Sequence, residues 1–420
     1  MVAYHFPPLA GSSGIQRTLR FVQHLPALGW QPLVLTVRAF AYEKTSDDLI
    51  SEIPRGTVVR RAFALDTARH LQIAGRYIGA MARPDRWKSW IIDGERQGAK
   101  LIEQFEPELI WSTYPIASAH VIASRLQRRF GLPWVADFRD PMAQDGYPPD
   151  PLTWQRYLEV ELSAMTQAQY CVFTTPGAAQ MYRDRYPQSA NKIVVLENGY
   201  DEESFPVRSN VLKAGLEPMM TSGRPMVLLH SGIVYPSERD PTCLFQALGR
   251  LAREGRLAPA DLIIRFRASV HDDLLQKLAM EHECLPFIQL RPATPYRDAL
   301  VEMMQVDVLL VLQASNCNAQ IPAKIYEYLR AGRPIFALTD PMGDTACVMR
   351  QAGLAEVTPL DDADAIAEAL VVLLSRWRRG QLPTADPAAV SQASRSHRSH
   401  QLAALFDTCT SVGSCGQGAN

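Results

Sequence analysis

An apolar run and the bounded helix behind it constrain the fold of this chain more than any other feature. The run from Val306 to Leu312 is almost entirely apolar and predicts a buried strand. Pro322 favours a first helical turn, because its ring fixes φ and its missing N–H would have no partner there. Gly332 and Pro334 favour the end of that helix, and 335–338 is the next apolar strand. Strand, loop, helix and strand in this order form one unit of a parallel α/β fold.

The same alternation continues on both sides of residues 206–224, which are irregular and rich in Pro, Gly, Ser and Met. Alternating strands and helices predict parallel sheets covered by helices. At 420 residues the chain is long enough for about two or three domains. We therefore predict an α/β protein with a first domain at 1–205, a linker at 206–224, a second domain at 225–390 and a disordered tail at 408–420.

Composition excludes several classes of protein. Charge is balanced, with 43 Lys+Arg against 44 Asp+Glu, whereas nucleic-acid binders carry a basic domain. Seven spaced cysteines without a C-x-x-C pair argue against disulfides or a zinc site and favour a reducing cytoplasm. We expect no membrane span and no signal peptide, because no apolar run is long enough and the start is not basic. Asp361, Asp362 and Asp364 precede a helical run, so we expect a helix cap there and no metal.

Two polar residues on the predicted helix behind Pro322 are candidates for binding. Lys324 and Glu327 are three residues apart and share one face near the helix N-terminus. Ligands of open parallel sheets bind there, beyond the carboxyl ends of the strands. A lysine can meet a diphosphate, and a carboxylate one turn further can accept hydrogen bonds from ribose hydroxyls. The alternative is an ordinary surface ion pair, which contributes about 0–1 kcal/mol to stability.

Two further clusters in the first domain are candidates for chemistry. Gly11 and Gly14 flank two serines ahead of a helical pattern, so the loop either approaches a ligand closely or is a plain turn. Asp137, Arg139 and Asp140 directly follow an apolar strand. Two carboxylates around a guanidinium suit chemistry or sugar hydroxyls at a strand's carboxyl end. The alternative is a self-neutralising ion cluster that shapes a loop.

A basic amphipathic segment lies within residues 66–104, which we expect to be largely helical. Arg69, Arg76 and Arg83 are seven residues apart, and apolar side chains line the other side of the predicted helix. Such a helix can lie in an anionic membrane interface. An ordinary surface helix that packs on its own domain shows the same pattern.

Residues 322–335 resemble the donor-site helix of the retaining GT-B glycosyltransferases, the large family that includes lipopolysaccharide and capsule enzymes. Residues 4–17 resemble the first loop of that family, and 134–141 resemble its aspartate–any–arginine–aspartate–proline segment. The resemblance follows motif order over nearly all of residues 3–406. It implies two facing Rossmann-like domains with an interdomain cleft, and a helix at 391–406 that crosses back to the first domain. Relatives carry more apolar residues at the start, so the natural start is expected upstream of Met1.

The resemblance also implies roles for individual residues. Asp137, Arg139 and Asp140 are then the catalytic candidates in the acceptor domain, and Gly11 and Gly14 touch the donor phosphate or the acceptor. The remaining donor-binding candidates are Gly232 and Arg239 in a phosphate loop, Lys324 on the diphosphate and Glu327 on the ribose. This chain departs from the common family pattern at Ala319, where a glutamate is usual, and at Ile233, where an arginine is usual.

The implied reaction transfers a sugar, with retention and without a metal or cofactor, from a nucleotide-sugar donor to a saccharide or lipid-linked acceptor. A role in cell-surface polysaccharide synthesis, in the cytoplasm or at the inner face of an anionic membrane, is expected. Two alternatives remain open: a nucleotide-sugar epimerase or hydrolase of the same fold, and a non-catalytic nucleotide-sugar binding protein.

Overall fold

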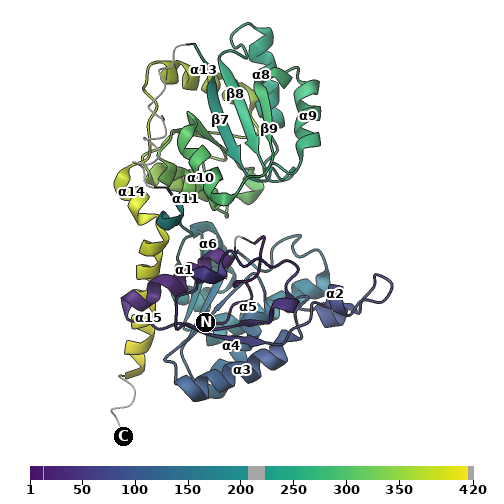
Figure 1. Ribbon diagram of the computed structural model, residues 1–420, viewed down its shortest axis with the longest axis vertical. Coiled ribbons are helices and arrows are strands. Elements are labelled where there is room, and N and C mark those ends of the chain that lie inside the picture. Colours follow the sequence, from purple (N-terminus) through teal and green to yellow (C-terminus); the bar gives the residue numbers. More distant parts are fainter. Residues whose placement is uncertain (13, 207–222, 415–420) are drawn as a thin grey trace. The chain divides into compact units, whose positions relative to one another are not determined.

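The computed structural model describes residues 1–12, 14–206 and 223–414, and the chain divides into two compact units (Figure 1). The first unit comprises Met1–Asn198 and the segment from Arg395 onward, and the second unit comprises Gly199–Ser394. Each is built on a parallel sheet, so the predicted α/β class with two parallel-sheet domains is confirmed. Of the predicted linker, residues 207–222 lie outside the described residues. The chain enters the second unit before that linker, because Tyr200 and Phe205 pack in its core.

The sheet of the first unit is completed by the first residues of the chain. Val2 forms parallel bridges to both β1 and β3, so the first residues of the chain join the sheet only as a short bridge between them. Amide hydrogen bonds from Val2 to Trp111 and from Ala3 to Leu35 tie the chain start to both neighbours. The sheet runs β2 (Val58–Ala62), β1 (Leu33–Val37), residues 1–3, β3 (Ile110–Thr113), β4 (Trp134–Arg139), β5 (Tyr170–Phe173) and β6 (Ile193–Val195).

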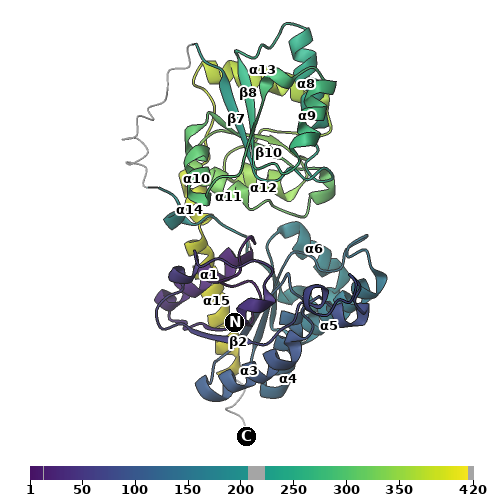
Figure 2. The same cartoon turned by 45° about the vertical axis from the view of Figure 1, so that its right-hand side comes forward.

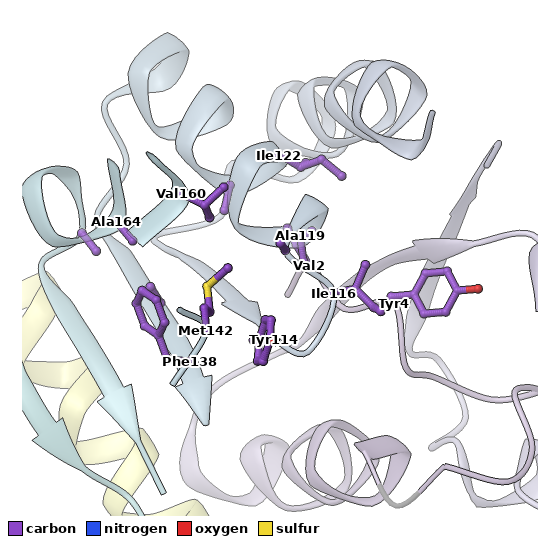
Figure 3. Packing of buried hydrophobic residues seen from close by; sticks show 14 of the residues in the cluster. Val2, Tyr4, Tyr114, Ile116, Ala119, Ile122, Phe138, Met142, Val160 and Ala164 are labelled. Carbon is purple, nitrogen blue, oxygen red and sulfur yellow. The ribbon is translucent and has the colours of Figure 1, made fainter. Parts of the chain in front are cut away.

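Helices cover this sheet because their apolar faces pack in three hydrophobic clusters. Figure 3 shows the largest cluster, with Met142 between Phe138 and Tyr114. A second cluster joins Phe21 of α1 to Phe406 and Cys409 of α15. The predicted disordered tail from residue 408 is therefore wrong at its beginning, since the helix continues through Cys409 to Ser414; residues 415–420 lie outside the described residues. The helices of this unit are α1 (Gly14–His24), α2 (Thr67–His70), α3 (Trp90–Phe105), α4 (Ser118–Phe130), α5 (Pro151–Gln167), α6 (Pro176–Arg185) and α15 (Arg395–Ser414).

The helical region predicted over residues 66–104 is confirmed at α2 and over 90–104 in α3, but it is wrong between them. Between α2 and α3 the chain forms a turn, in which Ala74 has φ 50° and Gly75 has φ 76°. Left-handed backbone of this kind cannot continue a right-handed helix. Ile73 and Arg76 exchange backbone hydrogen bonds across the turn, and only a 3-10 helix at Gly79–Ala82 follows before α3. The arginines Arg69, Arg76 and Arg83 therefore do not line one helix face.

The second unit is organised around β7, its first strand. The chain adds β8 and β9 on one side of β7, and then returns to add β10, β11 and β12 on the other. Such a reversal of strand order opens a crevice beyond the carboxyl ends of the central strands, where ligands of α/β proteins bind. In sheet order the strands are β12 (Val357–Thr358), β11 (Ile335–Leu338), β10 (Val308–Leu312), β7 (Met226–Ser231), β8 (Leu262–Arg267) and β9 (Ile288–Arg291), all parallel.

Seven helices of the described residues cover both faces of this second sheet (Figure 2). One core holds residues of α8, α9 and α13, and the other holds residues of α10, α11 and α12. The Asp362 carboxylate accepts from the amides of Asp364 and Ala365, so the predicted cap of α13 is confirmed. These helices are α8 (Thr242–Arg253), α9 (Asp272–Glu281), α10 (Tyr296–Gln305), α11 (Lys324–Ala331), α12 (Asp344–Gln351), α13 (Ala363–Arg378) and α14 (Pro387–Gln392).

Candidate functional sites

A cationic cluster lies where β7 ends in the second unit. The Nζ of Lys324, the first residue of α11, is 3.0 Å from Nε2 of the buried His230 in β7. Gly232, just past the strand, has φ 107°, and a Cβ atom there would lie 3.3 Å from the same Nζ. Arg239 donates to the Ile233 carbonyl at 2.5 Å and lies over a tyrosine ring. The structure thus brings together three predicted donor-binding residues, Gly232, Arg239 and Lys324, beside the N-terminus of one helix.

The charges in this cluster are only partly offset by a carboxylate. Burial first, and then Arg239, lower the pKa of Lys324 well below its usual value, while Glu327 raises it. Among the residues that the structure describes, neither Lys324 nor Arg239 forms a salt bridge with a carboxylate. Two nearby cations at a helix N-terminus repel one another until an anion enters. The cluster is therefore suited to a phosphate or diphosphate group.

Glu327 lies one turn along the same helix and is half-buried. Its Oε1 accepts from the Tyr296 hydroxyl at 2.7 Å, which fixes the carboxylate from the start of α10. The neighbouring Tyr328 accepts from the Ser231 amide at 2.9 Å and so ties α11 to β7. Neither tyrosine contact was predicted, because each joins residues from different elements of the unit.

The ends of this helix follow the sequence prediction with one shift. Gly332 has φ 67° and ends the helix as expected. Pro322 lies before the N-cap residue Ala323, so it precedes the first turn and does not belong to it. The Pro322 carbonyl accepts from the Ile325 amide at 2.9 Å, which begins the helical turn. Ile325, Tyr328 and Leu329, which share one face at helical spacing, are all buried.

In the first unit, two predicted residues, Gly14 and Arg139, are close to one another and to His5. A Cβ atom on Gly14 would lie 2.3 Å from Nδ1 of His5 and 2.9 Å from Nη1 of Arg139, so only glycine fits there. Gly11 has φ 76° in open space, so its role is to turn the loop. Ser12 Oγ lies 3.2 Å from Nδ1 of His5 and accepts from the Gly14 amide at 3.2 Å. Burial, together with Arg139, lowers the pKa of His5 to about 4.

The three residues predicted as catalytic have different surroundings. Asp137 is fully buried, and both its oxygens are 2.9 Å from the Arg17 guanidinium, while the Thr113 hydroxyl donates to it at 2.9 Å. Arg139 is half-buried, with φ 62°, where β4 shifts register against β5. Asp140 is exposed. Arg139 and Asp140 thus remain accessible, whereas both carboxylate oxygens of Asp137 are buried and accept hydrogen bonds from Arg17 or Thr113.

Buried Glu161 of α5 shapes the loop that follows β4. One of its oxygens accepts from the Ala143 amide at 2.8 Å and from the Tyr182 hydroxyl. The other accepts from Arg185 and from Tyr186, both at 2.9 Å. Tyr182 in turn accepts from the Met142 amide at 2.9 Å. This network fixes the loop that follows Asp140, and nothing in the local sequence indicated it.

Within residues 1–12, 14–206 and 223–414, no group of three or more His, Cys, Asp or Glu side chains is placed to hold a metal ion. No helix in these ranges combines the length and the apolar character that crossing a membrane requires. His120 of α4 is fully buried, with Nδ1 2.8 Å from the Ser112 hydroxyl.

Comparison with known proteins adds a family match within the first unit and a fold for the whole chain. Residues 13–199 match the family described as the glycosyl transferase 4-like domain. No curated protein matches the sequence. A glycosyltransferase from Rickettsia africae superposes with a TM-score of 0.66 at 13% identity, over 97% of this chain and 98% of that one. A sucrose-phosphate synthase from Thermosynechococcus elongatus gives 0.66 at 14% identity, over 98% and 99%. HepE from Anabaena, in complex with UDP, gives 0.65 at 13% identity, over 97% and 98%.

These likenesses extend over both units and show the fold. The chain has the α/β fold of the GT-B glycosyltransferases, with one parallel-sheet domain in each unit. The family match lies in the unit that carries Arg139 and Asp140. The chain is therefore a GT-B-fold protein whose first unit matches a glycosyltransferase 4-like domain.

Proposed function

We propose that this protein is a glycosyltransferase that moves a sugar from a nucleotide-sugar donor to a hydroxyl of a saccharide or lipid-linked acceptor. The observation that carries the proposal is the cationic cluster of Lys324 and Arg239, which lacks a carboxylate partner in the described residues. The match of residues 13–199 to a glycosyltransferase family supports it, as does the likeness to a protein that binds UDP.

In this proposal the second unit binds the donor. Lys324 and Arg239 hold the diphosphate beside the N-terminus of α11, and Glu327 accepts hydrogen bonds from the ribose hydroxyls. As the bond to the sugar breaks, negative charge grows on the diphosphate, and fixed cations stabilise that charge. The chemistry therefore needs no metal or other cofactor. Retention at the anomeric carbon is part of the proposal, on the basis of the motif at residues 322–335.

The first unit binds the acceptor in this proposal. Exposed Asp140 and half-buried Arg139 meet the acceptor hydroxyl, and the loop of Gly11 and Gly14 approaches the ligand closely. Asp137 is a positioning residue, because it orients Arg17 and the start of α1. Synthesis of a cell-surface polysaccharide in the cytoplasm fits this acceptor class.

Contact with an anionic membrane is proposed for a loop, in place of the helix expected from the sequence. The turn after α2 exposes apolar side chains, with Ile73 83% and Ile78 68% exposed, beside the exposed Arg76. Residues 67–84 contain three arginines and no acidic residue, which complements an anionic lipid surface.

An Ile73→Asp/Ile78→Asp variant should lose most of its co-sedimentation with phosphatidylglycerol vesicles. Met342→Asp, at an 87% exposed site of the second unit, is the matched control; equal binding by all three proteins would refute the contact.

Product analysis tests the proposed function directly. The protein is incubated with a panel of nucleotide sugars, with and without a membrane extract, and the products are identified by mass spectrometry. Acceptor-dependent sugar transfer is expected. Turnover of the donor alone would favour the epimerase or hydrolase alternative. Binding of nucleoside diphosphate without turnover of any donor would favour the non-catalytic alternative, which the alanine at position 319 keeps open.

A further inference from the structure

We propose that His230 is a positioning residue that holds the Lys324 ammonium in place for the donor diphosphate, an inference that rests on the proposed function. His230 is the second-to-last residue of β7 and is fully buried. Nothing in its local sequence distinguishes it from a core histidine, and no donor-binding role was predicted for it.

Hydrogen bonds at both ring nitrogens define the orientation of the imidazole. Nδ1 lies 3.1 Å from the carbonyl oxygen of Leu310 in β10, which can only accept, so Nδ1 carries the proton. Nε2 is then the acceptor, and Lys324 Nζ donates to it at 3.0 Å. The chain of contacts runs from the backbone of β10 through His230 to Lys324. It spans the reversal of strand order between β7 and β10, where ligands of such sheets bind.

The groups around the imidazole keep it neutral. Lys324 and Glu327 face this region from α11, Arg239 faces it from the loop after β7, and the Phe266 ring of β8 lies 6.0 Å away. Burial, followed by the two cations, holds the pKa of His230 well below its usual value. A neutral ring can accept the hydrogen bond from Lys324, whereas an imidazolium could not.

A neutral acceptor suits this position better than a carboxylate. A carboxylate would fix the ammonium equally well, but it would also cancel its charge and compete with an incoming diphosphate. Imidazole orients one N–H of Lys324 and leaves its charge and its other two protons for the ligand. Gly232 keeps the space beside Nζ free of a side chain, since a Cβ atom there would lie 3.3 Å from Nζ and crowd it.

A double-mutant cycle with inorganic pyrophosphate tests the inference, because this probe needs no knowledge of the nucleotide base. Binding is measured by calorimetry for the full chain and for His230→Leu, His230→Gln, Lys324→Met and His230→Leu/Lys324→Met. We expect His230→Leu to weaken binding about tenfold, as the loss of a hydrogen bond to a charged group would. His230→Gln retains an acceptor and should restore most of the affinity. In the Lys324→Met background, His230→Leu should have no further effect.

Controls separate this role from simple loss of packing. His120→Leu removes an equally buried histidine of the first unit and should leave pyrophosphate affinity unchanged. The inference would be overturned if His230→Leu left pyrophosphate affinity unchanged. It would also be overturned if His230→Leu lowered that affinity equally in the unmodified protein and in the Lys324→Met variant. Nitrogen NMR of histidine-labelled protein tests the contact without any ligand, through a shift of the His230 Nε2 resonance in Lys324→Met. If the unmodified protein binds neither pyrophosphate nor any nucleoside diphosphate, the proposed function fails, while an unchanged Nε2 resonance refutes the contact itself.

Discussion

Both units have cationic side chains near the ends of their central strands, but the partners of these cations differ. In the first unit Arg17 is buried against Asp137 and donates to the carbonyls of Leu196 and Glu197 as well. In the second unit Lys324 and Arg239 have a histidine ring and a carbonyl as partners. A cation whose charge is cancelled stabilises the fold, whereas a cation whose charge remains can bind a ligand. The difference therefore separates a structural ion pair from a binding site, although both lie near the carboxyl ends of strands.

The largest expected effect comes from breaking the ion pair of the first unit. Arg17→Met leaves the Asp137 carboxylate buried without its partner, and such losses cost about 3–5 kcal/mol of stability. Urea unfolding followed by circular dichroism measures the effect. The control is Arg156→Met, which breaks an exposed pair with Glu159 and should change stability by less than about 1 kcal/mol. Similar stability of both variants would mean that the buried pair is not structural.

The next effect concerns the accessible carboxylate of the same unit. Asp140→Asn keeps the shape of the side chain but removes its charge, so turnover should fall about 100-fold or more if the carboxylate handles the acceptor proton. Affinity for nucleoside diphosphate should stay near that of the unmodified protein, because the donor cluster lies in the other unit. Enzyme kinetics and calorimetry measure the two quantities separately. A large loss of nucleotide affinity would contradict the assignment.

A third variant tests the donor cluster of the second unit. Glu327→Ala should weaken nucleoside-diphosphate binding about tenfold to a few hundredfold, since hydrogen bonds to a charged group contribute about 1.5–3 kcal/mol. Lys324→Ala should also slow the chemical step if the lysine stabilises the leaving group. Glu281→Ala, at an exposed position of α9, is the control for calorimetry. Unchanged affinity in a folded Glu327→Ala protein would mean that Glu327 is only a surface residue.

The smallest effect is a pH dependence of the free energy of unfolding, which comes from a buried histidine of the first unit. Burial lowers the pKa of His120 to about 4, whereas an unfolded histidine titrates near 6.5. Unfolding therefore takes up a proton in this range, so the stability that the neutral ring contributes is complete above pH 6.5 and is lost as pH falls to about 4. The slope is about 1.4 kcal/mol per pH unit. His120→Gln should flatten the curve of unfolding free energy between pH 7 and 5, whereas the exposed His400→Gln should not; equal slopes would refute this origin.

Much of the fold and part of the candidate site could be predicted from local sequence. Gly332 and the apolar face of Ile325, Tyr328 and Leu329 defined α11 closely, because a helix end and a helix face are encoded within a few residues. The same reasoning was wrong for the middle of residues 66–104. There the seven-residue spacing of arginines suggested a helix, but the left-handed pair Ala74 and Gly75 interrupts it. Spacing alone cannot reveal such a turn when the surrounding pattern remains compatible with a helix.

The sequence by itself determined the alternation of strands and helices, the C-terminal end of α11, the cap of α13, and which polar residues lie near strand ends, although Asp137 and Arg139 belong to β4 and do not follow it. Only the tertiary structure decided which charges are cancelled. Arg17 meets Asp137 across 120 residues, and Lys324 meets His230 across 94. Helical and strand periods report only which side chains share a face of one element. The partner of a buried charge depends on which elements the sheet order places beside each other, and that order arises when the whole core packs.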